Sequence, residues 1–338
     1  MIPIIDVAAL FGSKSPARDA ADKAIMAAAC DVGFVTVTGL PADFAPTKER
    51  RARLLSVFEL PEAEKRKLYR AKFLPRQPNV YRGWFPLQSG AMTYKEGIDM
   101  GPDLADPAFP SDPTDPLTEA TPLPPESAIP GWRDAAANYY RGMGRLGATL
   151  MRSVARGLEL PETTFDAAFV GGISTLRLIH YPVRHEQSFE GADPAKVWVE
   201  HQGKRRYTIG AAHVDSGFVT LLAQDGVEGL QARAKDGTWL DVPPVEGTLA
   251  VNFGGLLQKW TAGRIKATEH RVLGPGRARF SIPFFYEPRV DAEIQSMAHL
   301  GGERFAPFLY GDHLWKATTK FVEFKGLEAM RTPRGPAA

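Results

Sequence analysis

Two histidines and one aspartate have the residue types of a metal site: His213, Asp215 and His270. Two imidazoles and one carboxylate are the ligand set of mononuclear non-haem Fe(II) centres, in which one face of the ion stays open for other ligands. If His213 lies at the end of a strand, residues i and i+2 project to the same side, so His213 and Asp215 can reach one ion. His270 must then come from a distant strand that folding brings alongside. We refer to these three residues as the metal triad.

A possible anchor for an organic acid follows the triad in the sequence. Arg279 and Ser281 alternate along residues 278–285, which are expected to form a strand, so the two side chains share one face. A guanidinium group beside a hydroxyl suits a carboxylate, because arginine can hold a carboxylate through two parallel hydrogen bonds. The sequence therefore predicts a metal site with a carboxylate anchor close to it.

The sequence around these residues carries further motifs. They are HVDSGFVTLLAQD at 213–225, NFG at 252–254, TEHRV at 268–272, RFS at 279–281, and, nearer the amino terminus, PIID at 3–6, GFVTV at 33–37, YRGWFP at 81–86, KEGIDMG at 95–101 and RLIHYP at 177–182. Together they resemble the isopenicillin N synthase-like family of Fe(II)/2-oxoglutarate-dependent oxygenases. The resemblance covers about residues 3–290, and we expect a bacterial-type member of the family.

The resemblance implies a role for each candidate residue. The metal triad would hold Fe(II), while Arg279 and Ser281 would bind the distal carboxylate of 2-oxoglutarate, steadied by Tyr181. With O2 as the other co-substrate, the enzyme would oxidise an unactivated C–H bond of a small molecule, most often by hydroxylation, and release succinate and CO2. Three more residues would line the substrate pocket by their positions in the family: Arg82, Trp84 and Arg177.

Several alternatives stay open at this point. The same family contains oxidases and cyclases that use no 2-oxoglutarate, and members that convert it to ethylene, and the Arg-x-Ser pair does not separate them. The triad residues are also compatible with a zinc hydrolase, although hydrolysis needs no carboxylate anchor. A non-catalytic jelly roll that binds small molecules is a further alternative, although it would not need an intact triad.

Two departures from the family pattern bear on the site. Gly255 stands where the family usually has aspartate, which we expect to affect a turn more than the chemistry. Residues 183–212 form an insertion directly before the metal triad. Because loops on a rigid scaffold often carry recognition, this insertion is a candidate lid or substrate-recognition loop.

The elements that must position these residues follow from patterning. Helical spacing favours helices at 16–31, 47–70 and 305–321. A strand is expected at 34–38, and from about residue 173 short strands such as 175–180 are separated by turn residues. The fold class is therefore mainly β with flanking helices, which the resemblance sharpens to a double-stranded β-helix (jelly roll) buttressed by amino-terminal helices. We expect one compact unit with five parts: an amino-terminal helix and strand region (1–102), a Pro-rich loop (103–131), a long helix (132–160), the catalytic core (170–290) and a helical tail (291–338) with a frayed end from residue 331.

Composition limits the partners. The chain has 41 Lys and Arg against 39 Asp and Glu, a net charge of +2, and no like-charge block of the kind that binds nucleic acid or anionic membranes. Its single cysteine, Cys30, fits a reducing compartment, and no leader or membrane-spanning stretch is recognisable. We expect a cytoplasmic enzyme that acts on a small molecule as a monomer or weak homo-oligomer.

Overall fold

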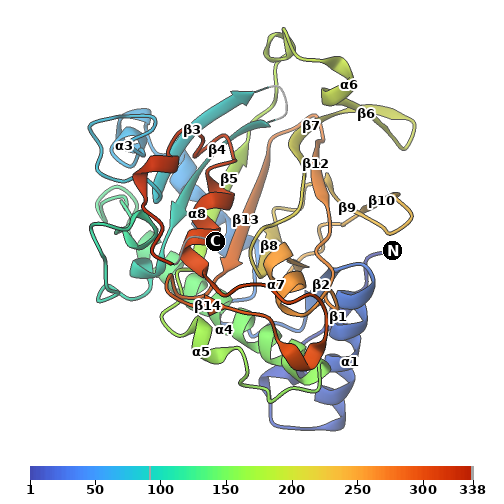
Figure 1. The fold of residues 1–338 in the computed structure, drawn as a ribbon. Helices are drawn as coiled ribbons and strands as arrows, with labels where there is room; N and C mark the ends of the chain where they lie inside the picture. Colours follow the sequence, from blue (N-terminus) through green and yellow to red (C-terminus); the bar gives the residue numbers. More distant parts are fainter. Residues whose placement is uncertain (91–92, 336–338) are drawn as a thin grey trace.

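One large mixed sheet dominates the computed structural model, which describes residues 1–90 and 93–335 (Figure 1). Within these residues the sheet has 13 strands in the order β1-β2-β11-β8-β13-β5-β4-β7-β12-β9-β10, with β3 beside β4 and β6 beside β7. The strands are β1 Ile4–Asp6, β2 Phe34–Thr38, β3 Gly83–Gly90, β4 Thr93–Met100, β5 Thr175–Tyr181, β6 Trp198–His201, β7 Lys204–His213, β8 Val219–Gln224, β9 Leu230–Arg233, β10 Trp239–Asp241, β11 Leu249–Phe253, β12 His270–Gly274 and β13 Arg279–Tyr286, and a separate pair is formed by β14 Glu293–Ile294 and β15 Phe308–Leu309.

The sheet curls around a cavity. Strands β4 and β7 meet where Thr93 pairs with Gly210, so that β5 and β13 lie on one side of the cavity and β7 and β12 on the other. This arrangement confirms a mainly β fold with flanking helices and a jelly-roll core. Several strands expected from the sequence have bounds within one residue of those observed, including β2, β5 and β13.

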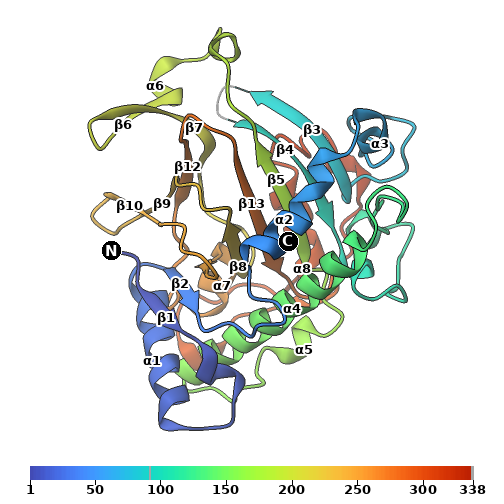
Figure 2. The ribbon, with the colours of Figure 1, turned by 180° about the vertical axis from the view of Figure 1, so that it is seen from behind.

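Helices cover one end and the back of the sheet (Figure 2). The helices of the described residues are α1 Pro16–Asp31, α2 Lys48–Leu55, α3 Glu62–Arg66, α4 Trp132–Gly157, α5 Asp166–Phe169, α6 Pro194–Val197, α7 Gly255–Trp260 and α8 Tyr310–Thr318, with short 3-10 turns between them, and it is α1, α2 and α4 that lie at that end and at the back. Helix α1 starts where the Ser15 hydroxyl accepts a hydrogen bond from the backbone N–H of Arg18, with proline as its first residue. Helix α4 buries a stripe of apolar side chains against α1 and β13: Leu146, Leu150, Met151 and Val154.

The helix expected at 47–70 is wrong as a single element. The structure has α2, a 3-10 turn at Ser56–Glu59 and then α3, with a break at Leu60 and Pro61. A residue before proline is pushed out of the helical region, and the proline ring removes a backbone donor, so a continuous helix cannot pass this point. The spacing of apolar and charged residues is helical both before and after Pro61, so the sequence pattern alone does not show the break.

The insertion before the metal triad is partly ordered by its own side chains. It contains a 3-10 turn at Glu186–Phe189, then α6, and then the hairpin of β6 and β7. Phe189 and Trp198 lie with ring centroids 4.9 Å apart, and both contact the ring of Tyr207 on β7. This small aromatic cluster fixes the insertion beside the strand that ends in the first triad residue.

The carboxyl-terminal segment also departs from expectation. Helix α8 is shorter than the helix expected at 305–321, and the residues after it run along the cavity. The tail is not frayed from residue 331, because Arg331 is 4% exposed and pairs with Asp115. Residues 336–338 of the expected tail lie outside the described residues.

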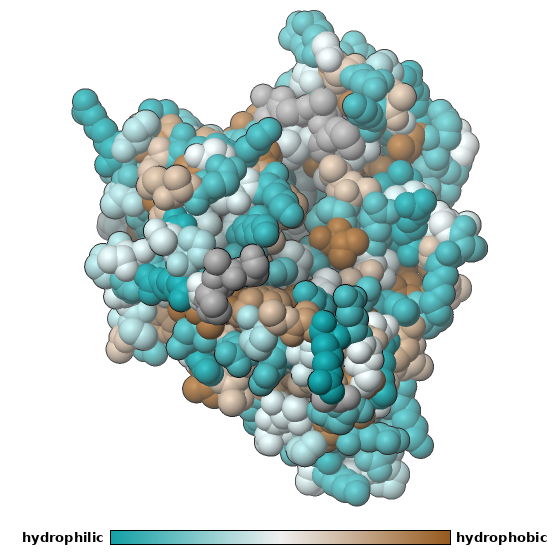
Figure 3. Space-filling view, in the orientation of Figure 1, coloured by the Kyte–Doolittle hydropathy of each residue, from teal (hydrophilic) through white to brown (hydrophobic). Residues whose placement is uncertain are grey.

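The surface facing the viewer in Figure 3 is mostly hydrophilic, with apolar side chains in small scattered groups. Among the described residues, no helix combines the length and the apolar character needed to cross a bilayer.

Candidate metal centre and co-substrate site

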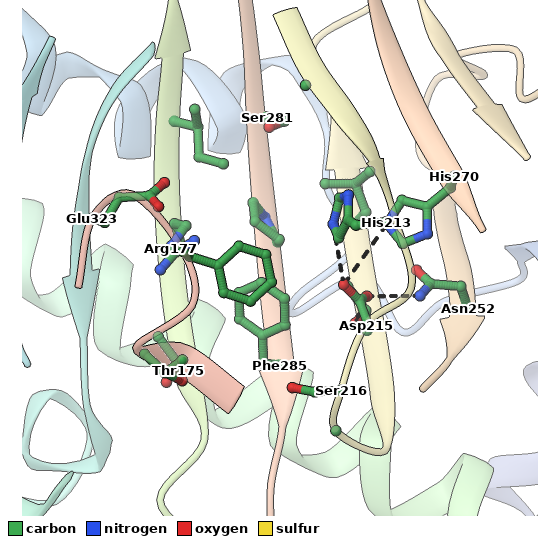
Figure 4. A pocket seen from close by; sticks show the side chains of 18 of the residues that line it. Thr175, Arg177, His213, Asp215, Ser216, Asn252, His270, Ser281, Phe285 and Glu323 are labelled. Carbon is green, nitrogen blue, oxygen red and sulfur yellow. Dashed lines mark hydrogen bonds and ion pairs between the residues drawn. The ribbon is translucent and has the colours of Figure 1, made fainter. Parts of the chain in front are cut away.

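The structure brings the metal triad together at the junction of three segments (Figure 4). His213 ends β7, His270 begins β12, and the two residues are direct partners in the antiparallel register. Asp215 lies in the loop that leads from β7 to β8. One ligand atom from each residue lies within 4.8 Å of the other two, and the Nε2 atoms of His213 and His270 are 3.5 and 3.7 Å from Oδ1 of Asp215. These separations are too long for strong hydrogen bonds but suit ligands that share one ion.

Both imidazoles are turned toward the same point by the backbone. Nδ1 of His213 lies 2.8 Å from the carbonyl oxygen of Ala211, and Nδ1 of His270 lies 3.1 Å from that of Thr268. A carbonyl oxygen only accepts hydrogen bonds, so Nδ1 carries a proton in each ring, and in the neutral form of the ring Nε2 is then the atom with the free lone pair. Holding the distal N–H of a histidine in this way fixes its tautomer and orientation for metal binding.

The carboxylate of Asp215 is held by two residues that the sequence did not single out. Its Oδ2 accepts hydrogen bonds from the hydroxyl of Thr220, at 2.6 Å, and from the side-chain amide of Asn252, at 2.7 Å. Oδ1 is thereby left facing the two Nε2 atoms. Both residues lie within motifs noted above, but their role depends on the loop after β7 meeting strands β8 and β11, which a motif does not reveal.

The charges of the triad suit a cation. Burial acts to raise the pKa of Asp215, but the two imidazoles and the hydroxyl of Thr220 outweigh it and hold this pKa well below its usual range. Burial lowers the pKa of His270. Burial also acts to lower the pKa of His213, but the carboxylate of Asp215, 3.5 Å from its Nε2, raises it overall. The site thus presents an ionised carboxylate beside a neutral imidazole, as a divalent metal requires.

The three residues expected to bind the co-substrate lie together on neighbouring strands of the same cavity. Arg279 on β13 pairs directly with Tyr181 on β5, and its guanidinium carbon lies 5.4 Å from the centre of the tyrosine ring. Ser281 follows two residues later on the same face. Arg279 is fully buried, and its Nη2 donates a long hydrogen bond of 3.4 Å to Oε1 of Gln224.

Arg279 has unused hydrogen-bonding capacity. Among the described residues, no partner accepts from its Nε or Nη1 atoms, although both are buried. A buried guanidinium group without a partner is costly, and a bidentate carboxylate is the ligand that removes the cost. The distal carboxylate of 2-oxoglutarate therefore fits this position.

Comparisons with known proteins agree with this geometry. The model of the 2OG-Fe(II) oxygenase superfamily matches residues 174–288, and the model of the non-haem dioxygenase in morphine synthesis N-terminal region matches residues 2–126. A 2-oxoglutarate-Fe(II) type oxidoreductase of Aspergillus fumigatus is 31% identical over 319 residues, with 89% of this chain and 86% of the relative covered. The chain belongs to the 2OG-Fe(II) oxygenase superfamily. It is an oxidoreductase that uses Fe(II), 2-oxoglutarate and O2.

The oxygenase is also similar to other known proteins. Isopenicillin N synthase of Streptomyces clavuligerus is 28% identical, with 93% of each chain covered. The crystal structure of a full-length Neurospora crassa protein in complex with alpha-KG has a TM-score of 0.77 at 24% identity and covers 95% of this chain and 96% of the other, a likeness of fold. Because fungal enzymes are prominent among the relatives, the expectation of a bacterial-type member is corrected.

The oxygenase has a cavity of about 480 Å³ around the triad and Arg279, a size typical of small-molecule sites. Arg177 lines it, but Arg82 and Trp84 do not. Arg82 is fully buried beneath the cavity, where its guanidinium group donates to the hydroxyl of Thr175 at 2.6 Å. Trp84 is fully buried against Phe58. Both residues lie in the YRGWFP motif, which led us to expect them in the pocket, but their side chains point into the core.

Gly255, which replaces the usual aspartate of the family, is the first residue of α7. Its backbone N–H donates to the carbonyl oxygen of Asp215 at 2.7 Å, so it supports the loop of the metal triad through its backbone.

Proposed function

We propose that His213, Asp215 and His270 hold the iron of this oxygenase. We propose further that Arg279 and Ser281, with Tyr181 beside them, hold the distal carboxylate of 2-oxoglutarate. The observation that carries the proposal is the buried guanidinium group of Arg279, of which two nitrogen atoms, Nε and Nη1, have no partner among the described residues, in the same cavity as a preorganised triad. A zinc hydrolase would gain nothing from such a group.

The reaction we propose is hydroxylation of a C–H bond of a small molecule, with one oxygen atom entering the product and the other entering succinate as CO2 is released. When bound, the iron supplies the oxidising chemistry. The residues of the chain orient the two imidazoles, keep Asp215 ionised and fix the co-substrate by its far end. The apolar strands around them exclude water from the reacting atoms.

The test is an anaerobic titration of the protein with Fe(II) and then with 2-oxoglutarate, following the weak visible charge-transfer band of a chelated keto acid. We expect the band in the unmodified protein and its loss in His213→Ala. Arg279→Ala should need a roughly 10- to 100-fold higher 2-oxoglutarate concentration to form the band, because it loses hydrogen bonds to a charged group. Arg277→Ala, which removes an exposed arginine two residues away, serves as the matched control and should behave like the unmodified protein.

Other outcomes are equally clear. If Fe(II) binds but no band forms at high 2-oxoglutarate, the 2-oxoglutarate-independent oxidase of the isopenicillin N synthase type takes precedence. If His213→Ala binds Fe(II) as tightly as the unmodified protein, the assignment of the triad is wrong.

We further propose a cytoplasmic enzyme that acts as a monomer or weak homo-oligomer and binds no nucleic acid. The near balance of acidic and basic residues supports this proposal, since it provides no electrostatic footprint for a polyanion. Sedimentation at several concentrations, with and without DNA, tests it.

A further inference from the structure

A second arginine lies on the same face of the cavity as the co-substrate anchor. Residues 175, 177, 179 and 181 of β5 all line the cavity, as alternate residues of one strand should. Arg177 is therefore roughly 13 Å along the strand from Tyr181, at a rise of about 3.3 Å per residue. In Figure 4 it faces the metal triad from the opposite side of the cavity. The position suits a group that holds the substrate while the triad acts on it.

Arg177 is only partly satisfied by the protein. Its Nε donates to Oδ1 of Asp99, and its Nη2 donates to Oδ2 of the same carboxylate at 2.8 Å. Among the hydrogen bonds of the described residues, none uses Nη1 of Arg177. Asp99 itself is 1% exposed and also pairs with the fully buried guanidinium group of Arg70. Two arginines thus share one buried carboxylate.

The charges nearby leave a positive surplus. Lys95 and Glu323, which both line the cavity, neutralise each other through a 2.7 Å ion pair. Arg82 faces Glu287, whose pKa burial raises to about 7, so this second carboxylate is only partly ionised near neutral pH. Both acids also act on Arg177, but the cluster still holds four cations, those of Arg70, Arg82, Arg177 and Lys95, against the three carboxylates of Asp99, Glu287 and Glu323. A cavity wall with one positive charge in excess favours an anion.

The rest of the cavity wall is largely apolar and aromatic. Phe285 on β13 lies opposite Thr175 in register, and its ring is 5.5 Å from the guanidinium carbon of Arg177. Phe321, which follows α8, has its ring centre 6.1 Å from that of His213. These two rings border the space between Arg177 and the metal triad, so an apolar group there would be buried against them.

We propose that the prime substrate of this oxygenase is an organic carboxylate, with its anionic group on Nη1 of Arg177 and an apolar body between Phe285 and Phe321. The inference rests on the proposed function, because the apolar body is then the part presented to the iron. Arg177 acts as a specificity-determining residue and takes no part in the chemical step.

The experiment uses the Fe(II)-loaded protein with 2-oxoglutarate and O2 and measures succinate release. The probes are aryl- and alkyl-carboxylates of two to ten carbons, each paired with its primary amide. We expect acids to accelerate succinate release at least tenfold more than their amides, since the acid gains a charge-assisted hydrogen bond. In Arg177→Gln this preference should disappear, whereas Arg177→Lys keeps the charge beside Asp99 and should retain part of it. Both variants should keep the visible 2-oxoglutarate band of the unmodified protein.

Equal or greater acceleration by the amides, no acceleration by any acid, or an acid preference unchanged in Arg177→Gln would each overturn the proposal. Absence of the 2-oxoglutarate band in the unmodified protein would instead count against the proposed function. If Arg177→Gln does not fold, Arg177→Lys still decides the question, because an undiminished acid preference without the guanidinium fork contradicts the assigned role.

Discussion

The carboxylate of Asp215 is oriented by hydrogen bonds from two neighbouring side chains. The hydroxyl of Thr220 and the amide of Asn252 occupy Oδ2, so Oδ1 is the atom presented with the two imidazoles. We predict that Thr220→Val, which keeps the side-chain shape, weakens Fe(II) binding by roughly 10- to 100-fold, as loss of partners around metal ligands usually does. Thr36→Val removes a buried hydroxyl from β2, away from the cavity, and is the matched control. Equal Fe(II) affinity of the two variants, measured by anaerobic titration, contradicts the prediction.

Glu287 makes stability depend on pH. Burial raises its pKa from an ordinary value of 4.5 to about 7. The folded protein therefore holds this proton to higher pH than the unfolded chain, and stability falls as pH rises from about 4.5 to about 7, then stays level for this group. Glu287→Gln cannot titrate at this position. We therefore expect the free energy of unfolding of the variant, relative to that of the unmodified protein, to rise by up to about 3 kcal/mol between pH 5 and pH 8. Urea unfolding at both pH values measures this gain, and an equal difference at the two pH values rules it out.

Residue types and spacing were enough to predict that the side chains of the triad and of the Arg-x-Ser pair lie in one cavity, because strand alternation and a strong motif restrict where these side chains can point. They were not enough for Thr220 or Asn252, whose partner is chosen by the register of β8 and β11. The same patterns predicted Arg82 and Trp84 in the pocket because both belong to the YRGWFP motif, but both side chains are fully buried and neither lines the cavity.

At the scale of elements, the start of α7 offers a matched pair of glycines. A Cβ on Gly254 would lie 2.3 Å from the backbone oxygen of Gly217, whereas one on Gly255 would meet only the oxygen of Asp215 at 3.7 Å. Gly255→Ala should therefore stabilise the protein by about 0.4–1 kcal/mol, by reducing the freedom of the unfolded chain. Gly254→Ala should destabilise it, because backbone must move. Urea unfolding of both variants gives the sign of each change in the free energy of unfolding. A Gly255→Ala variant less stable than the unmodified protein would show that this glycine has a role beyond its backbone N–H.

The elements themselves were predictable where local signals agreed. Helix α1 has a serine cap and a proline start, and β13 has alternating residues, so both bounds were correct within one residue. The segment 47–70 failed because Pro61 interrupts an otherwise helical pattern. The expected frayed tail failed because the pairing of Arg331 with Asp115 joins residues far apart in sequence, and no local pattern contains that information.

At the scale of the whole molecule, that same pair ties the end of the chain to the Pro-rich loop. The side chains of Arg331 and Asp115 are 1% and 0% exposed, with Nε 2.8 Å from Oδ1, and Arg331 also holds Asp312 on α8 at 2.6 Å. The tie thus keeps α8 in place, and the residues directly after α8 line the cavity beside Phe321. One wall of the cavity is therefore supported by a contact made outside the cavity.

Breaking this tie should cost far more than breaking a surface pair. Arg331→Met leaves the buried carboxylate of Asp115 with a weaker ion pair, to Arg334, whose Nε lies 3.4 Å from Oδ2. We expect a loss of roughly 3–5 kcal/mol in the free energy of unfolding. Adding Asp115→Asn removes the unpaired charge and should restore part of the loss. The exposed pair of Arg152 and Asp166 is the control, and Arg152→Met should cost at most about 1 kcal/mol. Hydrogen exchange should also quicken in residues 310–324 of Arg331→Met. If exchange there is unchanged while stability falls, the tail stabilises the fold without holding the cavity wall.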